Sequence, residues 1–183
     1  MRRCAPLIAA IALLASCSGP AAIRVPATEL DSLIAFSNPA MCEMTPETAA
    51  LVAGLFRNDP DTQGDSWIQP GAVPAHLRDQ LGPITRQKYD GWWTIRTAVR
   101  AKLWELPLIA IEQVFPEGGD PGGITFEFQA PVETVERAAR ERGFIAEAGK
   151  AVPMSPPDAL SYEIDLYPAP RDRSRSLLSC GYS

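Results

Sequence analysis

The order of its predicted elements indicates an α+β domain, in which a curved antiparallel sheet of about five strands packs against two or three helices. Apolar and polar residues alternate with a period of two over residues 92–104, and the alternation recurs at 124–129 and 160–167. This period is typical of half-buried strands. Residues 131–143 instead repeat their apolar positions at helical spacing. Three strands, a helix and two more strands in this order predict the α+β class.

Two helices are expected before the sheet. Thr45 is a suitable N-cap, Pro46 fits the first helical position, and the apolar residues continue to Arg57. A second, shorter helix is expected over residues 74–81, where Gly82-Pro83 would end it.

The strands are predicted at 92–104, 108–115 and 124–129, and after the intervening helix at 160–167 and 175–182. That helix begins at Pro131. Gly143 is expected in the left-handed position just after its last turn, with Phe144 packing back onto the helix.

The first two strands are expected to form a hairpin. The apolar face of 92–104 is odd-numbered and so are most apolar positions of 108–115, so burying both sets on one face requires paired residue numbers with an even sum. A turn over residues 105–107 gives the sum 212, which places Arg100 opposite Glu112.

Length and charge exclude some classes of function. The chain has 183 residues, 17 of them Lys or Arg and 22 Asp or Glu, for a net charge of −5. This length suits one domain with a tether. An acidic protein is not suited to coat nucleic acid or anionic lipid with its whole surface, so nucleic acid is not an expected partner.

The N-terminus has the pattern of a signal peptide. Arg2 and Arg3 precede an apolar run at 4–14, and the small residues Ala15 and Ser16 follow. Eleven apolar residues are too few for a membrane-spanning helix, which needs about 20.

Leu14-Ala15-Ser16-Cys17 resembles the lipobox of bacterial lipoproteins, whose cysteine is acylated and becomes the first residue of the mature protein. The resemblance implies a signal peptide at 1–16 and lipidation of Cys17. The small and polar residues that follow indicate that the lipidated segment 17–28 is a flexible tether, and the chain length indicates a single α+β domain at 29–183. Because Ser18 stands where an aspartate commonly marks inner-membrane retention, the resemblance implies the periplasmic face of the outer membrane. The alternative is an ordinary secretory peptide cut after Ala22, which would leave a soluble protein without Cys17.

Two cysteines remain once Cys4 leaves with the signal peptide and Cys17 carries lipid. Cys42 and Cys180 are then the free thiols of an exported domain, where two thiols are usually structural, and they are predicted to form a disulfide. The alternative is a nucleophilic cysteine served by His76, the single histidine of the chain.

One loop resembles the front of a calcium site. Asp59, Asp61 and Asp65 place oxygen ligands at alternate positions around Gly64, but Pro70 occupies the position where an EF-hand loop has its bidentate glutamate. An acidic surface turn is the competing interpretation. Apart from this possible Ca²⁺ site, no cofactor is expected.

The even-numbered face of the first strand is the candidate ligand or partner face. It would align two indoles around three basic side chains, namely Trp92, Arg96, Arg100, Lys102 and Trp104. Such a surface could hold an anionic glycan or an acidic segment of an envelope protein through charge-assisted hydrogen bonds and aromatic contacts. The competing interpretation is a solvated outer face of an antiparallel sheet.

The function expected from these features is that of an envelope-anchored lipoprotein that binds a partner or assembles with one without catalysis. No catalytic residue is assigned, because the chain contains none of the common hydrolase signatures. Two alternatives remain: an envelope hydrolase that uses unassigned carboxylates, and a purely structural lipoprotein.

Overall fold

The computed structural model describes residues 28–55, 73–116, 122–154 and 162–182, and within these ranges eight strands form one sheet. The strand order is β1–β5–β6–β7–β10–β9–β8, and β4 pairs with the same edge of β5 as β1 does. The strands are β1 (Thr28–Glu29), β4 (Leu81–Tyr89), β5 (Trp92–Leu103), β6 (Leu106–Pro116), β7 (Gly123–Phe128), β8 (Lys150–Pro153), β9 (Tyr162–Ala169) and β10 (Asp172–Tyr182).

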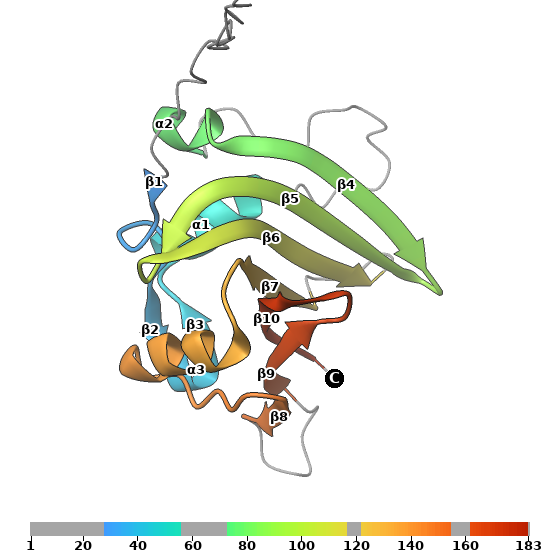
Figure 1. Ribbon diagram of the computed structural model, residues 1–183. Coiled ribbons are helices and arrows are strands. Elements are labelled where there is room, and N and C mark those ends of the chain that lie inside the picture. Colours follow the sequence, from blue (N-terminus) through green and yellow to red (C-terminus); the bar gives the residue numbers. More distant parts are fainter. Residues whose placement is uncertain (1–27, 56–72, 117–121, 155–161, 183) are drawn as a thin grey trace, which may run out of the picture.

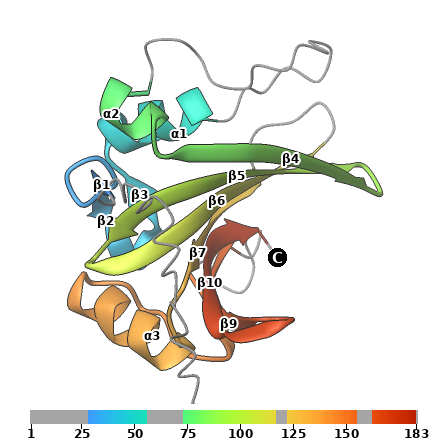
Figure 2. The same ribbon diagram turned by 45° about the horizontal axis from the view of Figure 1, so that its top comes forward.

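The remaining elements pack on the apolar face of this sheet. They are a two-stranded ribbon of β2 (Phe36–Asn38) and β3 (Glu43–Met44), a 3₁₀ turn at Pro39–Met41, and the helices α1 (Pro46–Leu55), α2 (Ala75–Arg78) and α3 (Val132–Glu141). In Figures 1 and 2 the strands β4, β5 and β6 arch over the part of the sheet formed by β7, β10 and β9. The α+β class is therefore confirmed.

The sheet is larger than the five strands expected, because β1, β4 and β8 were not predicted. The expected end of a helix at Gly82-Pro83 is wrong, since β4 begins at Leu81 and continues through both residues. Pro83 has no N–H to donate, and β4 is an edge strand that pairs with β5 alone among the described strands, where a proline is tolerated.

The predicted boundaries of α1 and α3 are close to those observed. The N–H of Thr48 donates to Oγ1 of Thr45 at 3.3 Å, so Thr45 caps α1 as expected. Gly143 has a φ of 91°, and the N–H of Phe144 donates to the carbonyl of Ala139 at 3.1 Å, which closes α3 as predicted. Phe144 then packs against Phe36, with ring centroids 4.9 Å apart.

The predicted register of the β5–β6 hairpin is wrong. Leu103 pairs with Leu106 across a two-residue turn of Trp104 and Glu105, and beyond a bulge the paired numbers sum to 208, not 212. Both turn residues are left-handed, with φ of 58° and 62°. Because the sum stays even beyond the bulge, the apolar face is still the odd-numbered one, and Ile95 to Leu103 are buried at every odd position.

Burial of the Trp104 side chain explains this unexpected turn. The indole is 6% exposed and lies 5.8 Å from the ring of Phe128 and 5.3 Å from that of Phe144. The two left-handed residues together cost about 2–4 kcal/mol, whereas burying about 200 Å² of aromatic surface contributes roughly 5 kcal/mol. Asp31 also stabilises the turn, because its Oδ1 accepts a hydrogen bond from the backbone N–H of Trp104 at 2.6 Å.

The predicted disulfide is present. Cys42 and Cys180 are joined, with Cα atoms 6.0 Å apart, and both are buried, at 5% and 1% exposed. The bond joins the segment between β2 and β3 to β10, so it links the beginning of the described chain to its last strand.

Candidate functional site

A row of polar side chains crosses the face of the sheet opposite the core. Neighbouring strands contribute one residue each at the same level, and every pair in the row is directly opposed. From β5 to β9 the row runs Arg96, Glu112, Thr125, Ser179 and Asp165. We call the whole sheet face that carries this row the polar face. Thr125 and Ser179 are joined by a 2.6 Å hydrogen bond between their hydroxyls.

Two arginines converge on Glu127 in the middle of the polar face. Arg96 donates from Nε at 3.1 Å, and also from Nη2, to Oε2 of Glu127, while Nη1 of Arg175 lies 3.5 Å from Oε1. The Glu127 side chain is 14% exposed. A carboxylate this buried is stable as an ion only when it is paired and hydrogen-bonded, so the cluster fixes the arginines in place.

Two other acids of the polar face have raised pKa values. Burial raises the pKa of Glu112, the positive charge of Arg96 lowers it in part, and repulsion from Glu127 raises it further. Burial also raises the pKa of Asp165, and repulsion from Glu163 adds to the effect. Desolvation disfavours the charged form in both cases.

A depression of about 200 Å³ lies beside this row. Asp165, Thr125 and Ser179 line one part of it, and the indole of Trp92, which is 43% exposed, lines another. Its floor is backbone. Gly123 and Gly181 face each other across β7 and β10 there, and a Cβ on Gly123 would lie 2.8 Å from the Cys180 carbonyl oxygen.

Trp92 reaches from β5 across β6 to this floor. A Cβ on Gly122 would lie 3.1 Å from Cζ3 of Trp92, so the six-membered ring of the indole lies close to that glycine. The depression therefore combines a flat aromatic surface with a carboxylate and two hydroxyls, which is the combination that small-ligand sites use for contact area and orientation.

Only part of the candidate ligand or partner face predicted on β5 is free to bind. Trp92 and Arg100 are exposed, but Arg96 is held by Glu127, and Nζ of Lys102 lies 3.0 Å from Glu29. Trp104 does not belong to the face, because its side chain is buried in the hairpin turn.

The other predicted sites are not part of this surface. The calcium candidates Asp59, Asp61 and Asp65 lie outside the described residues, as does Cys17. In the part of the chain that the structure describes, no three His, Cys, Asp or Glu side chains are grouped as metal ligands. His76 is exposed on α2, and both cysteines that it could have served are in the disulfide.

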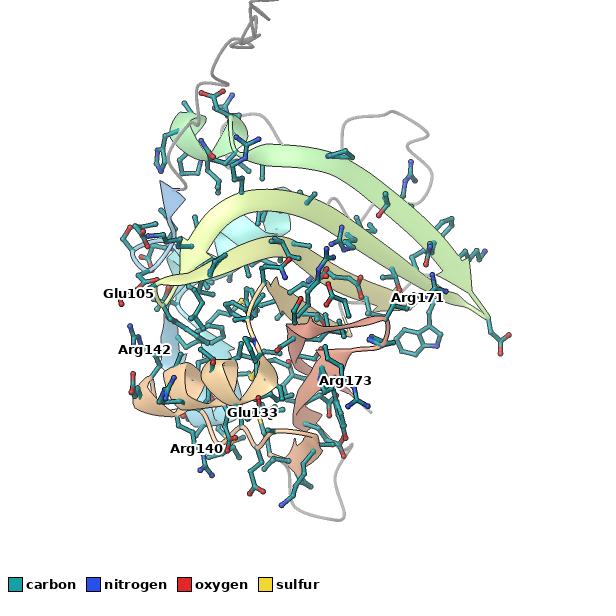
Figure 3. All side chains as sticks on the ribbon, viewed as in Figure 1. Glu105, Glu133, Arg140, Arg142, Arg171 and Arg173 are labelled. Atoms are coloured by element: carbon teal, nitrogen blue, oxygen red, sulfur yellow. A yellow bond between two sulfur atoms is a disulfide. The ribbon has the colours of Figure 1, made fainter. Side chains whose placement is uncertain are left out.

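Sequence reasoning missed Glu127, Asp165 and the glycine floor. Figure 3 shows where the charged side chains lie: Arg171 and Arg173 project from the β9–β10 hairpin, whereas Glu133 and Arg140 belong to α3. The alternation in 160–167 did place Asp165 on a polar face. Only the order of the strands brings it to the same depression as Trp92.

Comparison with known proteins adds no family. The chain matches no protein-family model, and no curated protein or solved structure matches it. Among the described helices, none has the length and apolar character needed to cross a membrane.

Proposed function

We propose that the chain is an envelope-anchored lipoprotein, tethered through Cys17, whose polar face binds an envelope partner or ligand without catalysis. The half-exposed Trp92 beside the depression carries this proposal. A large indole left partly in water on an otherwise polar face is typical of a binding surface, because tryptophan supplies apolar contact area together with one hydrogen-bond donor.

The hydrogen-bonded side chains of the polar face support a binding role. The Glu127 cluster holds two long arginine side chains, and the Thr125–Ser179 hydrogen bond fixes two hydroxyls. A surface that is ordered before it binds loses less conformational entropy on binding.

An anionic glycan is less well supported as the ligand than an envelope protein. Arg96 and Lys102 already pair with acids, which leaves less positive charge for a ligand. The hydrolase alternative has no specific support, because Glu112 and Asp165 are shifted in the same direction. A carboxylate acid–base pair requires the two pKa values to be pushed apart.

The anchor is tested by replacing the proposed lipidation site. The variant Cys17→Ser is expected to move from the membrane fraction to the soluble fraction, since a diacylglycerol and an amide-linked chain supply the anchoring. Wild-type protein that starts after Ala22 and carries no lipid by intact mass would contradict the proposal.

The binding face is tested by photo-crosslinking in intact envelopes. p-Benzoylphenylalanine is placed at Trp92 or at Tyr167, which is also exposed on the polar face, and at Ile145 as a control of similar exposure beyond α3. The same adduct is expected from the first two positions and not from Ile145. Equal adduct yield from Ile145, or no adduct from either aromatic position, would contradict the binding role.

A further inference from the structure

Two carboxylates on β9 lie close together on the polar face without a counter-charge. Asp165 and Glu163 lie two residues apart on the polar face, and within the described residues neither forms an ion pair or a side-chain hydrogen bond. Two acids on the other strands of the sheet, one on β7 and one on β10, are paired instead. Glu127 pairs with two arginines, and Asp172 pairs with Arg175 at 3.0 Å.

Their arrangement is unfavourable in the free protein. Side chains at i and i+2 of a strand project from the same face about 6.6 Å apart, and at that distance like charges repel. Asp165 is also partly desolvated. A cation bound in the neighbouring depression, next to the two acids, would offset both the repulsion between them and the desolvation of Asp165. An anion bound there would add to the repulsion.

The opposite part of the depression suits a cation equally well. The face of an indole attracts ammonium and guanidinium groups through its quadrupole, and tryptophan is the best of the aromatic side chains for this. The indole of Trp92 lies close to Gly122. Gly181 lines the same depression as Trp92 and lies directly opposite Glu163. The glycines leave space where side chains would otherwise fill the floor.

We propose that this depression binds an organic cation of the alkylammonium type, with Trp92 contacting the cation and Asp165 and Glu163 supplying the negative charge. The proposal rests on the binding role given above and names its ligand class. A free quaternary amine and the lysine side chain of a partner protein share this chemistry. A volume of about 200 Å³ holds one such group.

The test uses the purified protein and NMR detection of its indole N–H signals. The Trp92 signal is assigned by its loss in Trp92→Phe. Choline is titrated beside its neutral isostere 3,3-dimethylbutan-1-ol, and N-acetyl-lysine methylamide and methyl glucoside are added in separate arms. Choline or the lysine probe is expected to shift the Trp92 signal with saturation at a Kd on the order of millimolar.

The neutral isostere is expected to bind at least about tenfold more weakly, and Asp165→Asn is expected to weaken cation binding about two- to fivefold. Glu133→Gln, which makes the same change of charge on α3, serves as the matched control and should leave binding unchanged. The tighter of the choline and lysine probes identifies the source of the cation.

Three results would overturn the proposal: equal binding of choline and its isostere, binding of the glucoside in place of both cations, or cation binding that Asp165→Asn does not weaken. A failure here is distinguishable from failure of the binding role. Crosslinks from Trp92 and Tyr167 that persist without any cation effect would retain the polar face as a binding surface and reject only the ligand class.

Discussion

Loss of the Cys42–Cys180 disulfide is expected to destabilise the domain strongly. The two cysteines are 138 residues apart, and the loop that they close includes nearly the whole sheet. For a loop of this length, the entropy that the cross-link removes from the unfolded chain corresponds to about 5 kcal/mol. For a domain of this size, 1 kcal/mol shifts Tm by about 2–4 °C, so reduction should lower Tm by about 10–20 °C.

The assay is urea and thermal unfolding followed by tryptophan fluorescence, with and without dithiothreitol. The double variant Cys42→Ala/Cys180→Ala should reproduce the loss without reductant. Adding dithiothreitol to that variant should change nothing, which shows that the reductant acts through this bond.

The reasoning would be refuted by a loss of less than about 1 kcal/mol on reduction. Detection of two reactive thiols in the unfolded, unreduced protein would refute it equally, because the buried cysteines would then be unpaired.

Three further predictions concern the polar face and the β5–β6 turn. Glu127→Gln should cost about 2 kcal/mol, because it leaves two partly exposed arginines without their shared counter-charge, and a loss equal to that of Glu133→Gln in urea unfolding would contradict this. The pKa of Glu112 is raised above its usual 4.5, so ionisation of this carboxyl destabilises the fold as pH rises through that raised pKa. Glu112→Gln should therefore be more stable than wild type at pH 7. The difference in stability should vanish below about pH 4.5, where the carboxyl is protonated in both the folded and the unfolded state. Glu105→Gly should stabilise the folded domain by about 0.5–1 kcal/mol, since Glu105 is exposed with a φ of 62° that glycine adopts more easily. Glu133→Gly in α3 should instead destabilise the domain by about 1 kcal/mol. Thermal melts of both variants test this pair of predictions.

Local patterns were sufficient for the elements whose cause is local. The alternation of 92–104 identified the buried face of β5, and Gly143 identified the end of α3. The disulfide was also predictable, because the proposed processing leaves a single pairing. Edge strand β4 was not predictable in the same way, since Gly82 and Pro83 favour a turn unless a neighbouring strand fixes them.

The site was harder to predict than the fold because several strands build it. Trp92 and Arg96 followed from the alternation of one strand, but the partner of Arg96 is Glu127, two strands away. Trp104 does not lie on the predicted face, because its indole is buried against Phe128 in the turn. The energy of that burial depends on tertiary contacts. The conformational propensities of the hairpin residues carry no information on such a tertiary contact.

The disulfide also determines how the domain would respond to mechanical tension. A pulling force applied between residue 28 and residue 182 passes through the Cys42–Cys180 bond, so the chain between the two cysteines carries no load. That enclosed segment represents about 480 Å of hidden contour length at full extension. While the disulfide is intact, force can extend only the short segment before Cys42. The face around Trp92 and Asp165 would therefore keep its shape while tension acts between these two ends of the domain.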